Sequence, residues 1–145
     1  MQTKVVKIDS ANIDDAAMKE ACDLIRAGEL VAFPTETVYG LGGNALDPMA
    51  SKKIYAAKGR PSDNPLIVHI SKFEDLVSIA REVPPQAKKL ADAFWPGPLT
   101  MIVWKNDRVP YETTGGMDTV AIRMPKHPVA LRLIEGSGCL IAAPS

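Results

Sequence analysis

Two cations near position 60 have the types and spacing to bind a phosphate-bearing ligand. Lys58 and Arg60 are separated by one residue, so both side chains project to the same side if the chain is extended there. Pro61 favours that extended conformation at Arg60. Arginine offers a planar fork to phosphate oxygens and lysine a mobile point charge, a combination that suits a polyphosphate. The alternative is a solvated basic loop at the end of a helix, which is the commoner role of such a pair taken alone.

An arginine within an apolar segment is the most informative single residue. Arg123 lies in segment 119–125, which is otherwise typical of a buried strand. A buried guanidinium requires an anionic partner. Glu36 is one candidate, as an internal ion pair, and on general grounds it is slightly favoured. A substrate carboxylate is the other candidate.

Hydroxyl groups, a carboxylate and glycines gather in segment 35–47. Thr35 and Thr37 offer hydroxyls, and Tyr39 offers a ring and a phenol. We expect this segment to be a long connection after a strand that Pro34 ends, and long loops within compact domains are often functional. Its glycines would let a ligand approach the backbone, or would supply positive φ angles in a structural turn.

The two histidines provide little support for a metal site. His69 is near the end of the apolar segment 66–70, where it would be either a hydrogen-bonded core residue or a ligand-facing side chain. His127 is in a predicted loop, and no cluster of cysteines or carboxylates accompanies either residue, so no metal site is predicted. No Ser/His/Asp or Cys/His arrangement is evident. An enzyme built on this chain would therefore position charged substrates and form no covalent intermediate.

Strands that alternate with helices must position these side chains. Extended segments are expected at 4–8, 30–33, 66–70, 99–104, 120–124 and 139–143. The first helix is expected to begin at an N-cap, Asn12, and to end before Gly28. Further helices are expected at 48–57, 73–80, 86–95 and 128–134. This order predicts an α/β domain with a largely covered mixed sheet.

Composition limits the classes of function. The chain has 145 residues, of which 46% are hydrophobic and 23% charged, as in a folded single domain. Seventeen basic residues balance seventeen acidic ones, so that no overall field attracts nucleic acid or an anionic membrane. Cys22 and Cys139 are far apart, which favours the reducing cytoplasm. No export signal and no membrane-spanning run is evident, so no membrane partner is expected.

Five segments, in this order, resemble the YrdC/TsaC family. They read FPTETVYGL at 33–41, KGRP and NPLIVH within 58–69, WPGPLT at 95–100, VAIRMP at 120–125 and APS at 143–145. The resemblance implies a YrdC-like fold, in which a twisted mixed sheet with flanking helices surrounds a concave basic cavity. It implies a threonylcarbamoyl-AMP synthase, which forms L-threonylcarbamoyladenylate and pyrophosphate from L-threonine, bicarbonate and ATP with Mg²⁺.

The family resemblance also implies roles for particular residues and partners. Its ATP-binding positions correspond to Lys58, Arg60, Asn64, Thr119 and Ser145, of which the first two would also be catalytic. Its threonine-binding positions correspond to Thr35, Thr37, His69, Arg123 and Ala143. Arg123 would pair with the substrate carboxylate. A threonylcarbamoyl transferase complex would then pass the group to an adenosine of tRNA, and tRNA or double-stranded RNA is a possible direct partner.

One departure from the family pattern and two alternative functions remain. The family has a Ser-x-Asn motif where this chain stops at Ser145. We therefore expect residues 1–145 to be a single YrdC-like domain that is truncated at its C-terminal end, and to fold or bind nucleotide less well than an extended chain. The alternatives are a carbamoyl-phosphate-using domain of hydrogenase maturation and a non-catalytic RNA-binding module. The zero net charge argues mildly against the RNA-binding module.

Overall fold

The computed structural model describes residues 3–59 and 64–144. Within them the helices are α1 (Asp15–Arg26), α2 (Pro48–Lys58), α3 (Phe73–Ile79), α4 (Pro85–Phe94), α5 (Tyr111–Thr114) and α6 (Pro128–Ser137). The strands are β1 (Val31–Pro34), β2 (Tyr39–Asn44), β3 (Ile67–His69), β4 (Thr100–Trp104), β5 (Thr119–Arg123) and β6 (Ile141–Ala143). No helix in these residues is long and apolar enough to cross a membrane.

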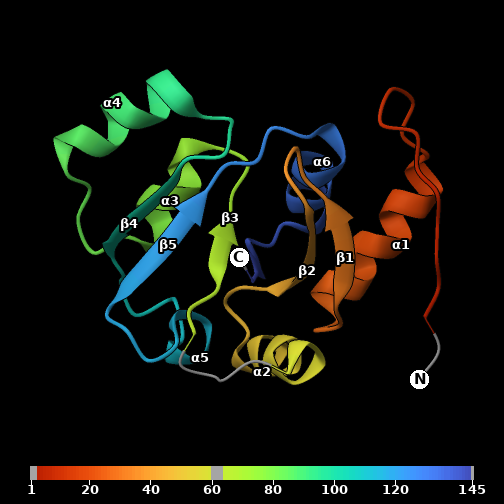
Figure 1. Cartoon of the computed structure of the whole chain (residues 1–145), viewed down its shortest axis with the longest axis horizontal. Coiled ribbons are helices and arrows are strands. Elements are labelled where there is room, and N and C mark those ends of the chain that lie inside the picture. Colours follow the sequence, from red (N-terminus) through yellow and green to blue (C-terminus); the bar gives the residue numbers. More distant parts are fainter. Residues whose placement is uncertain (1–2, 60–63, 145) are drawn as a thin grey trace.

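The strands form one mixed, twisted sheet in the order β1-β2-β6-β3-β5-β4 (Figure 1). Strands β3 and β5 are parallel, and the other neighbours are antiparallel. The predicted α/β class, a mixed sheet with flanking helices, is confirmed. Because β3 and β5 are in register, His69 lies beside Arg123 at the same level of the sheet.

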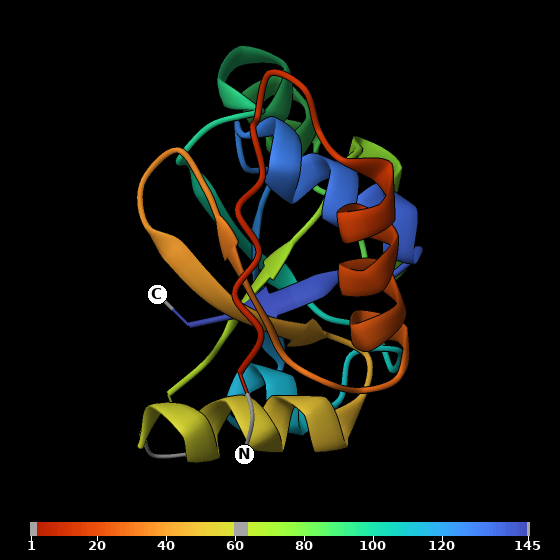
Figure 2. The same ribbon diagram turned by 90° about the vertical axis from the view of Figure 1, so that its right-hand side faces the viewer.

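Two hydrophobic clusters support the sheet and leave part of one face open. Val68, Val120 and Ile122 belong to a cluster shared with α2, α3 and α4. The second cluster joins α1 and α6 to β1 and β6, and Figure 2 shows these two helices side by side, on the opposite side of the molecule from the turn between β1 and β2. Since side chains alternate along a strand, His69 and Arg123 project to the face of β3 and β5 opposite the first cluster.

The segment predicted to be a long loop at 35–47 instead contains the strand β2, which takes up six of its thirteen residues. A four-residue turn at 35–38 connects β1 to β2, and β2 continues to Asn44. The glycines in β2 have no positive φ angles. A Cβ atom at Gly42 would lie 2.6 Å from both the Ile141 Cγ2 atom and the Phe33 ring, so close packing against the strand requires glycine here. The sequence prediction failed because it assigned these glycines to ligand approach or to turns and did not consider close packing within a sheet.

Helix α1 begins at a different residue from the one predicted. The Asp14 carboxylate accepts hydrogen bonds from the backbone N–H groups of Ala16 and Ala17, at 2.9 and 3.3 Å, and so caps the helix. The predicted cap, Asn12, is incorrect. Gly28 follows the helix with a φ of 83°, as predicted. Residues 4–8 are not part of the sheet, and the short helix α5 was not predicted.

Candidate functional site

One cavity of about 190 Å³ brings together all five residues assigned to threonine. Its lining comprises Thr35, Thr37, Val38, Gly40, Ile67, His69, Pro98, Thr100, Arg123, Ala143 and Pro144. The walls come from the β1–β2 turn on one side and from β3, β4, β5 and β6 on the other. Residues separated by more than a hundred positions in the sequence therefore surround one small space.

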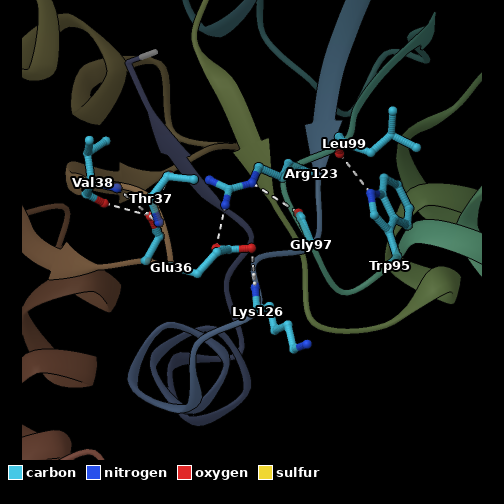
Figure 3. Close-up of polar contacts among 9 residues, drawn as sticks. Glu36, Thr37, Val38, Trp95, Gly97, Leu99, Arg123 and Lys126 are labelled. Atoms are coloured by element: carbon cyan, nitrogen blue, oxygen red, sulfur yellow. Dashed lines mark hydrogen bonds and ion pairs between the residues drawn. The ribbon is translucent and has the colours of Figure 1, made fainter.

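Arg123 is held by protein groups on two of its three nitrogens (Figure 3). Its Nη2 atom forms an ion pair with Glu36 Oε1, and its Nε atom donates a hydrogen bond to the Gly97 carbonyl at 3.2 Å. The second Glu36 oxygen accepts a hydrogen bond of 3.0 Å from the backbone N–H of Lys126. The internal partner considered for Arg123 is therefore present.

The remaining nitrogen of Arg123, Nη1, has no hydrogen-bond partner among residues 3–59 and 64–144. Figure 3 shows this end of the guanidinium on the side of Thr37, and Arg123 lines the cavity. The side chain is only 9% exposed. Glu36 therefore fixes the guanidinium while one nitrogen stays available to an anionic ligand, so the internal partner and a substrate carboxylate do not exclude each other.

Glu36 is ionised in this arrangement. Partial burial alone would raise its pKa, but hydrogen bonds from the backbone N–H groups of Glu36 and Lys126, together with the charge of Arg123, outweigh that effect. They hold the pKa of Glu36 below its ordinary value. The carboxylate thus balances the charge of the guanidinium, and the ion pair contributes no net charge to the cavity wall.

His69 is a neutral side chain in the wall of the cavity. It is 4% exposed, and its Nδ1 atom lies 3.1 Å from the Ile67 carbonyl and 3.2 Å from the Ile141 carbonyl. Two carbonyl acceptors require a proton on Nδ1, which leaves Nε2 as a hydrogen-bond acceptor. Burial and the nearby charge of Arg123 lower the pKa of His69 to about 4. The ring can therefore accept a hydrogen bond from a ligand at neutral pH.

Thr35 organises the turn that forms the other wall. Its hydroxyl donates to the Val38 carbonyl at 2.6 Å and accepts from the backbone N–H groups of Thr37 and Val38 at 3.3 and 3.2 Å. The hydroxyls of Thr35 and Thr37 are 3.1 Å apart. Thr35 is therefore largely engaged in the turn, and Thr37 is the better placed of the two to contact a ligand.

Sequence reasoning missed part of the cavity wall. Thr100 is paired with Arg123 in the β4–β5 register, and Pro98 lies two residues before it. Both residues belong to the motif at 95–100. This motif contributes to the family resemblance, but none of its residues was assigned to a binding site. A polar residue at the start of a strand, two residues after Pro-Gly-Pro, was the available signal.

Three of the residues assigned to ATP, Lys58, Asn64 and Thr119, are described, and they do not line this cavity. Lys58 is the exposed last residue of α2, and the Asn64 carbonyl accepts a 2.6 Å hydrogen bond from the Tyr55 hydroxyl. Thr119 is at the start of β5, four residues from Arg123, and projects to the same face of the sheet. Arg60 and Ser145 lie outside the described residues.

Known proteins share this fold and much of this sequence. The Sua5/YciO/YrdC domain family, described as "Telomere recombination", matches residues 23–145. The threonylcarbamoyl-AMP synthase of Pyrococcus abyssi (strain GE5 / Orsay) is 59% identical over 133 residues, or 92% of this chain and 39% of that protein. The threonylcarbamoyl-AMP synthase of Bacillus subtilis (strain 168) is 54% identical over 138 residues, or 94% of this chain and 40% of that protein.

A solved structure described as P. abyssi Sua5 complexed with L-threonine is also similar. It has a TM-score of 0.91 and 58% sequence identity, and the match covers 92% of this chain and 39% of that one. The chain thus spans about two fifths of the length of these relatives.

Proposed function

Because the chain belongs to the Sua5/YciO/YrdC family, we propose that it carries threonylcarbamoyl-AMP synthase activity. The family expected from the five sequence motifs is confirmed. The proposed reaction consumes L-threonine, bicarbonate and ATP, and it yields L-threonylcarbamoyladenylate and pyrophosphate. Two relatives named threonylcarbamoyl-AMP synthase are each more than 50% identical to this chain, and they support this reaction over the alternatives.

The observation that carries the proposal is the cavity between the β1–β2 turn and Arg123. It presents one guanidinium nitrogen, one histidine acceptor and threonine hydroxyls within a space suited to a small polar molecule. We propose that Arg123 binds the carboxylate of threonine and that His69 and Thr37 bind its amino and hydroxyl groups. The Ala143 backbone would complete the contact. The threonine named in the P. abyssi Sua5 structure supports this ligand.

We propose that ATP binds along the same sheet face through Lys58, Arg60, Asn64, Thr119 and Ser145. The reaction brings a threonine carbamate to the α-phosphate, so that two anions must approach each other. Their repulsion is about 4 kcal/mol for unit charges 4 Å apart at an effective dielectric of 20. Lys58 and Arg60 would offset this repulsion, which is their proposed catalytic role. A sheltered pocket would protect the carbamate and the mixed anhydride from water.

Mg²⁺ is proposed to accompany ATP. The described residues contain no group of three His, Cys, Asp or Glu side chains that could hold a metal ion. Glu36 is already engaged by Arg123 and by the Lys126 backbone. The donor set therefore fits an ion held mainly by substrate phosphates and water, as is common for Mg²⁺, better than a resident metal.

The proposal also concerns the partners and the location of the enzyme. We propose that a threonylcarbamoyl transferase complex accepts the product and that an adenosine of tRNA receives the group. Cys22 and Cys139 are both unpaired, which supports a reducing, cytoplasmic location.

Pyrophosphate release tests the proposed reaction. The assay contains ATP and Mg²⁺, and threonine or bicarbonate is omitted in turn. We expect release to require both, and Lys58→Ala to reduce it by weakening ATP binding. Release without threonine, or release supported by carbamoyl phosphate in place of threonine and bicarbonate, would contradict the proposal and favour a carbamoyl-phosphate-using domain.

Arg123→Lys tests the threonine site specifically. Lysine cannot keep the bonds to Glu36 and Gly97 and also offer a nitrogen to the ligand. We expect the KM for threonine to rise roughly 10- to 100-fold, as is usual when a hydrogen bond to a charged group is lost, while the KM for ATP changes little. Arg132→Lys, at an exposed ion pair with Asp15, is the matched control and should leave both values unchanged.

A further inference from the structure

A second cavity lies on the same sheet face as the threonine cavity. It has a volume of about 360 Å³ and is lined by Glu82, Pro84, Ile102, Val103, Trp104 and Thr119. Ile102 and Trp104 are unusually exposed for large apolar side chains in a strand, at 69% and 50%. The sheet thus presents an apolar surface, with an indole ring, that no other described element covers.

The strand register places this surface at a defined distance from the threonine cavity. Arg123 is paired with Thr100 at one end of the β4–β5 ladder, and Thr119 is paired with Trp104 at the other. All four side chains project to the same face, because the two residues on each strand are four positions apart and each is paired with a residue of the other strand. Four strand residues span about 13 Å. A ligand that starts at Arg123 and extends along β5 (Figure 1) therefore reaches the indole.

The indole is held in place but not covered. The Arg81 guanidinium carbon lies 5.2 Å from the centre of the Trp104 ring, so a cation stacks on part of the ring. Half of the Trp104 surface is still exposed. Aromatic side chains of this kind stack on nucleobases of any sequence. The Glu82 carboxylate lines the same cavity and offsets the charge of Arg81, so this surface offers a ligand mainly the ring and its apolar neighbour.

We propose that Trp104 is a stacking platform for the adenine base of ATP. This inference rests on the proposed function, because it needs ATP to lie along β5 with its phosphates between Trp104 and the threonine cavity. Ile102 extends the apolar surface beside the ring. Trp104 is then a determinant of nucleotide affinity that acts on the base and takes no part in the chemistry at the α-phosphate.

Tryptophan fluorescence tests the proposal directly, since the chain has two tryptophans and the other, Trp95, is buried. The probes are ATP and inorganic tripolyphosphate, which has no base. We expect ATP to quench the emission of the unmodified chain and tripolyphosphate to leave it unchanged. In Trp104→Phe, the ATP-dependent signal should disappear while affinity, measured by calorimetry, stays within about threefold, because phenylalanine can still stack.

Trp104→Ala should weaken ATP binding by roughly 5- to 100-fold, and Ile102→Ala, at the more exposed neighbour, should weaken it less. Thermal unfolding checks that each variant is folded. If ATP binds the unmodified chain and Trp104→Ala with equal affinity, the stacking proposal for Trp104 is wrong, and the proposed synthase activity is not contradicted. If neither binds ATP, both proposals fail. If the alanine variant instead loses only affinity for an RNA oligonucleotide, the surface binds RNA bases and the ATP proposal is overturned.

Discussion

At the scale of single residues, the ion pair between Glu36 and Arg123 is the least exposed ion pair among the described residues. The two side chains are 22% and 9% exposed, so the guanidinium has little access to water. Removing the carboxylate would leave a nearly buried cation without a counter-ion, which is much more costly than losing a surface pair. Glu36 is therefore a structural requirement of the site as well as part of its wall.

We expect Glu36→Ala to lower the free energy of unfolding by about 3 kcal/mol, measured by urea denaturation at pH 7. Glu20→Ala is the matched control, because Glu20 forms an exposed ion pair with Lys4 and such pairs contribute less than about 1 kcal/mol. Equal effects of the two substitutions would show that Arg123 does not depend on Glu36.

The neutral state of His69 predicts a dependence of stability on pH. Its pKa in the folded chain is about 4, against 6.5 for an unperturbed histidine. Between these values the unfolded chain binds the extra proton, so this stabilising contribution is complete above pH 6.5 and is lost as the pH falls towards 4. The difference corresponds to about 3 kcal/mol.

Urea denaturation between pH 4 and pH 7 measures this effect. His69→Gln should flatten the profile over that range, whereas His127→Asn, which keeps a capping side chain at the start of α6, should not. The stabilising contribution of Glu36 is complete above its ordinary pKa of 4.5 and is lost below it, and this carboxylate is present in both variants. A profile of equal slope in all three chains would mean that His69 is not held neutral.

At the scale of elements, the β1–β2 hairpin depends on a strand position without a side chain. We expect Gly42→Ala to destabilise the chain by about 1–3 kcal/mol, because the new methyl group would overlap Phe33 and Ile141. Phe33→Leu removes part of that obstacle, so the double substitution should cost less than the sum of the two single ones, as measured by denaturation. Strictly additive costs would exclude this overlap as the cause.

The start of α1 gives a second prediction at this scale. Asp14→Ala should lower stability by about 1 kcal/mol, because it removes the carboxylate that caps the helix. Asn12→Ala should change stability by less than half of that amount. Thermal unfolding distinguishes the two positions. A larger loss of stability for Asn12→Ala than for Asp14→Ala would indicate that Asn12 is the N-cap, as the sequence predicted.

Most elements were predictable from local patterns, but the strand β2 was not. Pro48 and Gly59 delimit α2 as expected, since proline suits a first turn and Gly59 adopts a φ of 65°. The strand β2 was missed because Gly42 packs against Phe33 of the neighbouring strand and against Ile141, which is 99 residues further along the chain. Local sequence patterns identify most helices and strands. Whether a glycine forms a turn or allows close packing within a sheet depends on contacts that these patterns do not show.

At the scale of the whole molecule, equal numbers of basic and acidic residues predict weak binding of RNA. We expect double-stranded RNA to bind this chain no more tightly than non-specific contacts allow, roughly 1–100 µM at physiological salt, by fluorescence anisotropy. Nanomolar affinity with a steep salt dependence that survives Lys58→Ala would instead support a binding module.

The candidate site was predictable only as a set of residues. The motif resemblance named Thr37, His69 and Arg123, but nothing in their spacing showed that they meet. The partner of Arg123 is 87 residues away, and it was one of two open candidates. Strand order could not be derived either, because β6 pairs with both β2 and β3, and this depends on the packing of the whole chain.

The position of β6 has a consequence for how the molecule folds. It is the last of the six strands along the chain, yet it lies third in the sheet, and it alone joins the β1–β2 hairpin to β3. Closing the contact between Gly43 and Ala142 means bridging 99 residues, and such long-range closure slows folding. During synthesis on a ribosome, the β1–β2 hairpin cannot be joined to β3, β5 and β4 until β6 has emerged. A nascent chain therefore acquires the cavity between the β1–β2 turn and Arg123 only after nearly all of the described residues have emerged.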